Sequence, residues 1–193
     1  TPLAVNTTNT TNLVGSCAPP TYLWTVNYTA SNCGTAPAVW NYTGGTSQTS
    51  ATPSFSFTTP GTYTITLTTT NSCGSVTTTP QTVTVTKPPT VALNTIPPIC
   101  QSFPTTSINP TAVATNCGIN ALSYEWSFPD GNPATSSTVI PGTITYSTTG
   151  TFTYSLKVTN ECGSTTANNS FIINPSPTIT GTLSSCIGTK SQL

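Results

Sequence analysis

Two stretches of alternating apolar and polar residues lie 89 residues apart and share most of their sequence. They are GTYTITLTTTNSCGS, residues 61–75, and GTFTYSLKVTNECGS, residues 150–164. A period of two predicts a β-strand with one face in the core, here Tyr63, Ile65 and Leu67 in the first copy. Each strand begins at a turn glycine and ends in Asn-x-Cys-Gly. The repetition indicates a chain built from copies of one unit.

The repeat extends outward from these strands. Before them stand short aromatic strands, then the tryptophan strands AVWNYTGG (38–45) and YEWSFPDG (124–131), then Asn-Cys-Gly at 32–34 and 116–118. The pattern predicts one unit over 1–87 and a second over 88–174. The tail 175–193 is predicted to start a third, because PSPTITGTLSSC (175–186) resembles PPTVALNTIPPIC (88–100), with Cys186 in the place of Cys100.

Short alternating strands separated by glycine and proline turns predict an all-β fold of tandem antiparallel β-sandwiches. The inward positions define two expected cores. They are Trp40, Phe55, Phe57, Tyr63, Ile65, Leu67, Val83 and Val85 in the first unit, and Tyr124, Trp126, Phe128, Ile144, Tyr146, Phe152, Tyr154, Leu156, Val158, Phe171 and Ile173 in the second. A core of this size is marginal alone, so cross-links are expected to help.

Charge is almost absent. The chain has three lysines, three acidic residues and no histidine or arginine, with a net charge of zero. Nothing here would neutralise a phosphate backbone, so we exclude nucleic acid as a partner. Without histidine, Ser–His and Cys–His catalytic arrangements are excluded, and we expect no enzyme activity, cofactor or metal site. No apolar run approaches the ~20 residues of a membrane span. We interpret the chain as a mature segment, cut from something longer.

Seven cysteines without a histidine favour disulfides over zinc sites. Disulfides persist in oxidising surroundings, so the expected location is extracellular, at the cell surface.

The tryptophan, aromatic and glycine positions of the second unit resemble the PKD domain (polycystic-kidney-disease-type repeat). The matching residues are Tyr124, Trp126, Phe128, Asp130, Gly131, Tyr146, Gly150, Thr151, Phe152, Leu156, Val158 and Asn160. Pro129 replaces the first glycine of the family pattern, and the first unit is a degenerate copy without the aspartate. The cysteine-bearing strand ends and proline joints resemble PKD-like and Ig-like arrays of large secreted proteins of Bacteroidota, including gliding-motility adhesins.

The resemblance implies sandwiches with strands A, B, E and D facing strands C, F and G, joined end to end. In that topology the B–C and F–G loops share one end, so we expect disulfides Cys33–Cys73 and Cys117–Cys162. Cys17, Cys100 and Cys186 remain, one per unit. They are candidates for disulfides between repeats or subunits. A competing scheme pairs Cys17 with Cys73 and Cys100 with Cys162; in a third interpretation the odd cysteine is a buried thiol.

The charged and aromatic residues have structural interpretations. Glu125 and Lys157 are expected to face outward as a cross-strand ion pair, and Asp130 to be a turn residue. The strip formed by Tyr22, Trp24, Val26 and Tyr28 is expected to pack into the core, the alternative being a sugar-stacking face. Five asparagines lie in N-glycosylation sequons: Asn6, Asn9, Asn27, Asn41 and Asn168.

These patterns favour a non-enzymatic structural segment of an extracellular adhesin or surface filament, stiffened by disulfides and proline linkers. Its expected partners are neighbouring repeats or subunits of the same protein, with surface polysaccharide as a further candidate. The alternative is a carbohydrate-binding or spacer region of a secreted hydrolase.

Overall fold

The first sandwich is formed by two β-sheets packed face to face. A computed structural model describes residues 2–12, 18–177 and 181. The smaller sheet has the order β1-β4-β3, with β1 at Leu3–Asn6, β4 at Ser54–Phe57 and β3 at Trp40–Thr43. The larger has β2 (Thr21–Ala30) beside β5 (Gly61–Asn71), which also pairs with β6 (Gly74–Thr77) and β7 (Gln81–Val85). The opening stretch GTYTITLTTTN is therefore the central strand β5.

The second sandwich follows the same plan with more strands. Its large sheet has the order β13-β12-β15-β16-β9, with strands at Thr135–Ser136, Ser123–Ser127, Gly150–Asn160, Gly163–Asn174 and Ile99–Cys100. Facing it are two ladders: β10 (Thr106–Ile108) with β14 (Ile144–Tyr146), and β8 (Thr90–Leu93) with β11 (Ala112–Thr115). All pairings are antiparallel except that of β9 with β16. The expected all-β fold of tandem antiparallel sandwiches is confirmed.

Each sandwich has its own core of alternating inward side chains. In the second, every expected core residue is buried except Tyr124, which is half-buried, and Ile108 joins them. In the first, Trp40 and Val83 are half-buried and pack against the core, while Trp24 lies inside it at 8% exposure. Tyr22, Val26 and Tyr28 pack against the same core, which confirms that this strip is a core-facing strand.

The structure corrects the alignment of the two units. Trp24 pairs with Leu67 across β2 and β5, as Trp126 pairs with Leu156 across β12 and β15. The indole nitrogens also match, since Trp24 donates to the carbonyl of Ser50 and Trp126 to that of Thr138, each at 3.0 Å. The counterpart of YEWSF is therefore YLWTV, residues 22–26. The expected counterpart, Trp40, lies instead in β3 of the opposite sheet.

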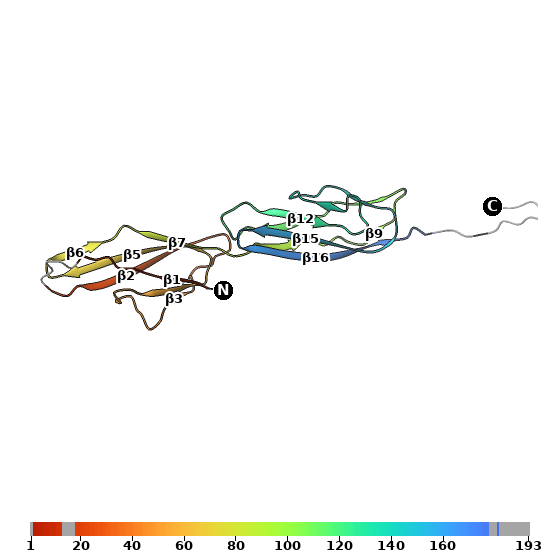
Figure 1. Ribbon diagram of the computed structural model, residues 1–193. Coiled ribbons are helices and arrows are strands. Elements are labelled where there is room, and N and C mark those ends of the chain that lie inside the picture. The colour runs from red at the N-terminus through yellow and green to blue at the C-terminus, as the bar shows by residue number, and fades with distance from the viewer. Residues whose placement is uncertain (1, 13–17, 178–180, 182–193) are drawn as a thin grey trace, which may run out of the picture.

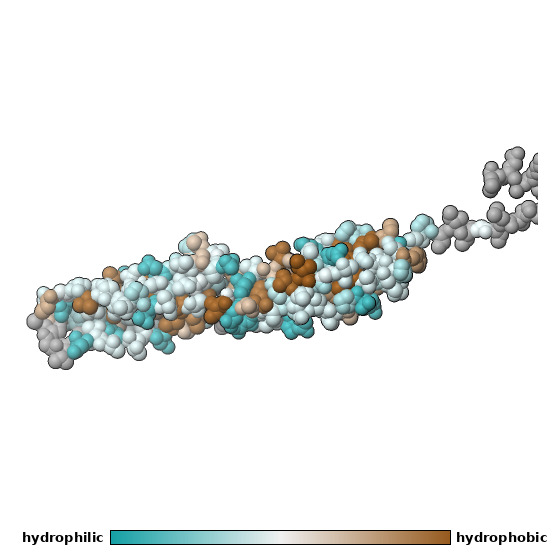
Figure 2. Space-filling view, turned by 90° about the horizontal axis from the view of Figure 1, so that it is seen from above, coloured by the Kyte–Doolittle hydropathy of each residue, from teal (hydrophilic) through white to brown (hydrophobic). Residues whose placement is uncertain are grey.

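The two sandwiches lie end to end, with their strands along one common direction (Figure 1). Side chains of intermediate hydropathy cover most of the surface of both sandwiches, and small apolar patches lie among these side chains (Figure 2). This surface reflects the strand pattern, in which threonines alternate with the core residues. No helix among the described residues has the length and apolarity needed to cross a bilayer.

Candidate functional site at the junction of the two sandwiches

A disulfide joins the two sandwiches. It connects Cys33, in the loop after β2, with Cys117, in the loop after β11, and their Cα atoms lie 5.2 Å apart. The two cysteines are separated by 84 positions in the sequence. Because one belongs to each sandwich, the bond acts as a staple across the junction rather than inside a core.

The expected pairs Cys33–Cys73 and Cys117–Cys162 are therefore wrong. The reason lies in the strand that precedes Cys33. Strand β2 runs antiparallel to β5, with Ala30 opposite Gly61 and Thr21 opposite Thr70. Cys33 consequently lies near the start of β5, whereas Cys73 follows its end. Eleven residues of strand span roughly 35 Å, far beyond the ~5–7 Å between Cα atoms that a disulfide bridges.

The other cysteine predictions have mixed outcomes. Cys117 and Cys162 do lie at one end of the second sandwich, but Cys117 is bonded to Cys33. Cys100 and Cys162 are exposed thiols, so the alternative pair Cys100–Cys162 is also wrong. Cys17 and Cys186 lie outside the described residues, and their proposed role between repeats or subunits stays a prediction.

The glycines after Cys33 and Cys117 explain the shared Asn-Cys-Gly motif. A Cβ atom at Gly34 would collide with the carbonyl oxygen of Pro60 and the hydroxyl of Tyr28. One at Gly118 would collide with the carboxylate of Glu161 and the amide of Asn160. Each cysteine loop thus packs against its own sandwich so closely that only glycine fits.

Glu161 fastens the loop that carries Cys117. Its carboxylate accepts hydrogen bonds from the backbone N–H groups of Ile119 and Asn120, at 2.7 and 3.2 Å. These bonds favour the charged form, and the one from Ile119 contributes most to lowering the pKa of Glu161 below its ordinary value. Glu161 therefore links the loop between β15 and β16 to the loop after β11.

The linker between the sandwiches is held by hydrogen bonds as well. The N–H of Lys87 donates to the carbonyl of Cys117 at 3.2 Å, and the buried amide of Asn160 donates to the carbonyl of Lys87 at 2.9 Å. Farther along, the hydroxyl of Thr165 donates to the carbonyl of Pro89 at 2.6 Å. The two peptide groups of Lys87 are thus bonded to the second sandwich, which limits hinge motion at that point.

The sequence places Asn160 in the family pattern but predicts no role for it at this junction. This asparagine is 8% exposed, and besides bonding Lys87 its side-chain oxygen accepts the N–H of Cys162 at 2.9 Å. The sequence did contain a signal, since Asn160 and Asn71 occupy the same place in the repeated Asn-x-Cys-Gly. Asn71 likewise accepts the N–H of Cys73 at 2.9 Å. The motif therefore encodes a turn in which asparagine orients the cysteine.

The remaining predicted residues lie away from the junction. Glu125 and Lys157 form the expected cross-strand ion pair at 3.2 Å, with both side chains exposed. Asp130 has a φ of 63°, as a turn residue can. The sequon asparagines 6, 27, 41 and 168 are exposed and Asn9 is half-buried; their glycosylation stays a prediction.

Comparison with protein families gives one match that is repeated along the chain. A model of the PKD domain matches residues 18–86 and again residues 89–174. No curated protein matches the chain.

The solved structures that resemble this chain include an array of Ig domains. The N-terminal four Ig domains of Dscam1 isoform 6.9 match with 17% identity and a TM-score of 0.44, over 80% of this chain and 38% of that one. Domains 3–5 of Drosophila OTK match with 15% identity and a TM-score of 0.36, over 80% and 52%. The amphioxus IgVJ-C2 molecule matches with 16% identity and a TM-score of 0.43, over 89% and 96%. The chain spans less than two thirds of the first two proteins.

Proposed function

The chain belongs to the PKD domain family, and from that premise we propose that it is a non-enzymatic structural segment of an extracellular adhesin or surface filament. Its proposed role is mechanical: the segment provides length and keeps its two sandwiches aligned. On this proposal the modules divide at residues 1–87 and 88–174, and the tail from 175 begins a third. The observation that carries the proposal is the Cys33–Cys117 disulfide, which spans two modules.

A bond between modules increases the stiffness of the chain more than it increases the stability of either core. The staple and the hydrogen bonds of Lys87 lie on different segments, so together they oppose both bending and twisting. Proline residues at 88 and 89 add to this restraint by fixing their own φ angles. A disulfide also fits an oxidising, extracellular location. Polysaccharide binding has less support, because the aromatic side chains of β2 pack against the core.

The proposal is tested by small-angle X-ray scattering extrapolated to zero concentration. The oxidised chain should scatter as one extended rod. Cys33→Ser removes the staple at a half-buried position, so the radius of gyration should fall and the distance distribution should broaden. Cys100→Ser is the matched control, since Cys100 is an exposed thiol outside the junction. Identical curves for Cys33→Ser and the oxidised wild type would contradict the mechanical role.

A further inference from the structure

The outer face of the large sheet of the second sandwich has a hollow with a volume of about 580 Å³. Ligand pockets usually have volumes of roughly 300–1,000 Å³, so the hollow is large enough for a small ligand. It is open to solvent and lies over three neighbouring strands, β12, β15 and β16. The polar side chains that line it on the outer face belong to Ser127, Thr153, Ser155, Asn168 and Ser170.

The floor of the hollow is strand backbone. Tyr154 and Asn169 lie opposite each other across β15 and β16 and also line the hollow. Tyr154 is 1% exposed, and side chains alternate between the two faces of a strand, so these two residues present their backbones to the outer face. Pro129, which follows β12, is exposed and adds an apolar ring to the lining. The hollow therefore combines polar groups with one small apolar surface.

Serine takes the place of threonine at three of these positions when the two units are compared. The central strands β5 and β15 begin at equivalent glycines, so their neighbours can be compared position by position. The equivalent cross-strand pairs are Thr25↔Thr66 with Ser127↔Ser155, and Thr64↔Thr82 with Thr153↔Ser170. Threonine has one methyl group more than serine. The three serines therefore leave room on this face that threonines would fill.

Asn168 is a second feature that distinguishes the two units at this place. It lies opposite Ser155 on the continuous strand β16. In the first sandwich the same side of the central strand is covered by two shorter strands, β6 and β7, and the residue equivalent to Asn168 is Pro80, between them. The hollow therefore gains a side-chain amide where the first unit has only a pyrrolidine ring.

The polar groups of the lining are available to a ligand. In the part of the chain that the structure describes, the side chains of Ser127, Ser155 and Asn168 form no hydrogen bond. Hydroxyl and amide groups can each donate and accept. The lining has no charged side chain, and the next residues along this face, Glu125 and Lys157, offset each other as an ion pair. The hollow therefore suits an uncharged ligand rich in hydrogen-bonding groups.

We propose that the hollow binds a sugar residue of an uncharged polysaccharide. Sugar hydroxyls donate and accept hydrogen bonds, so they match the serine hydroxyls and the amide of Asn168. The C–H groups of a sugar ring can contact the ring of Pro129. An acidic sugar would lose part of the hydration of its carboxylate without gaining a positive partner, because Lys157 is already paired with Glu125. Because the hollow is open, the polysaccharide can continue past it.

This site is separate from the aromatic strip of β2 and does not use aromatic stacking. On this proposal the second unit contributes attachment as well as length, so the two units differ in role although they share a fold. The inference goes beyond the proposed function, since a mechanical segment needs no ligand.

Two-dimensional amide NMR of the isotope-labelled chain, titrated with oligosaccharides, tests the proposal. The chain is produced without N-glycosylation, so that Asn168 is bare. The neutral probes are cellohexaose, mannohexaose and xylohexaose, and the charged probe is hexagalacturonate. At least one neutral probe should shift the backbone amide signals of residues that line the hollow, among them Tyr154 and Asn169. Hexagalacturonate should leave these signals in place.

Three substitutions together fill the hollow with methyl groups while keeping each hydroxyl: Ser127→Thr, Ser155→Thr and Ser170→Thr. This variant should fold, because the first sandwich has threonine at the same places and threonine favours strands. Its affinity for the neutral probe should fall at least tenfold. The matched control makes the reverse exchange at the equivalent positions of the first sandwich: Thr25→Ser, Thr66→Ser and Thr82→Ser. The control should bind like the wild type.

The proposal fails if no neutral probe shifts any amide signal of the hollow, or if the filled variant binds as tightly as the wild type. Shifts confined to residues outside the hollow would also overturn it. None of these results bears on the Cys33–Cys117 staple, whose effect on the rod is measured by scattering.

Discussion

Single residues decide how the cysteine loops are presented. Gly34 and Gly118 allow each loop to lie against its sandwich, and Glu161 binds the second loop through two backbone N–H groups. The sequence predicted the ion pair of Glu125 with Lys157, because its two partners alternate with core residues on neighbouring strands. It gave no comparable signal for Glu161, whose partners are backbone groups 41 and 42 residues away. Contacts of this kind depend on how loops meet, which alternation along the chain does not encode.

The charge of Glu161 should make the junction sensitive to acid. Its pKa is lowered in the folded chain, so its contribution to stability is fully present above the ordinary value of 4.5 and is lost as the pH falls through the lower, folded pKa. Thermal unfolding of the wild type and Glu161→Gln should differ near pH 7, with the variant less stable. The difference should shrink progressively below pH 4.5. A difference that stays constant down to pH 2 would contradict this assignment.

At the scale of elements, the alternating pattern predicted strands better than it predicted their partners. Strands β5 and β15 agree in residues, length and register with the repeated stretch that identified them. The sequence pattern aligns the first halves of the two units wrongly, because two tryptophans precede β5 and Trp40, like Trp126, is followed by a glycine turn. Only the pairing of β2 with β5 reveals Trp24 as the counterpart of Trp126. That error placed Cys33 at the wrong end of its sandwich and produced the wrong pair Cys33–Cys73.

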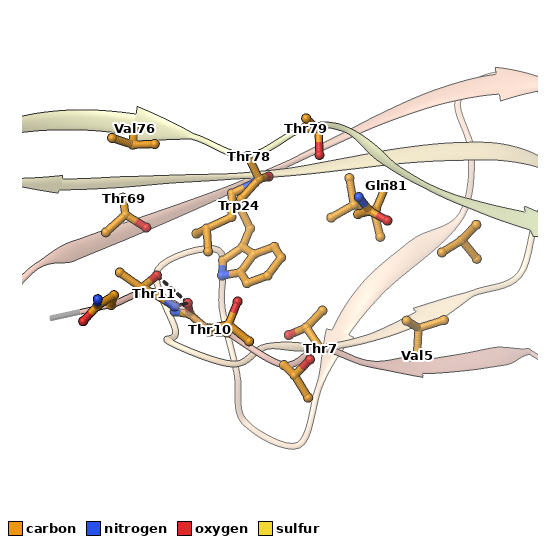
Figure 3. Close-up of a pocket in the computed structure, with 16 residues that line it drawn as sticks. Val5, Thr7, Thr10, Thr11, Trp24, Thr69, Val76, Thr78, Thr79 and Gln81 are labelled. Carbon is orange, nitrogen blue, oxygen red and sulfur yellow. Dashed lines mark hydrogen bonds between the residues drawn. The ribbon is translucent and has the colours of Figure 1, made fainter.

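The equivalent leucines on the central strands test the groove between the two sheets of the first sandwich, whose lining includes Trp24, Leu67 and Val76 (Figure 3). Leu156 is fully buried, and Leu156→Ala should destabilise its sandwich by about 2–5 kcal/mol through lost burial and a closed cavity. Leu67 lines the groove, so Leu67→Ala should cost clearly less in the monomer, because the space it leaves opens toward solvent. Denaturant unfolding of each sandwich measures both losses. Equal losses would indicate that the groove is closed in solution.

At the scale of the whole molecule, the chain is a rod of two PKD sandwiches with a covalent link between them. The repeated strand ends predicted both the modular plan and the use of disulfides. They did not predict that the bond would cross the junction, because that depends on which loops the end-to-end arrangement brings together. The disulfide therefore restrains how one sandwich is oriented relative to the other, rather than how either sandwich folds.

Peptide mapping without reduction tests this account most directly. Cleavage after aromatic and leucine residues places Cys33, Cys73 and Cys162 on separate fragments, and tandem mass spectrometry identifies the linked pairs. The structure predicts a fragment pair joined through Cys33 and Cys117. Recovery of Cys33 linked to Cys73, or of Cys117 linked to Cys162, would place the disulfides inside the modules and contradict the stapled junction.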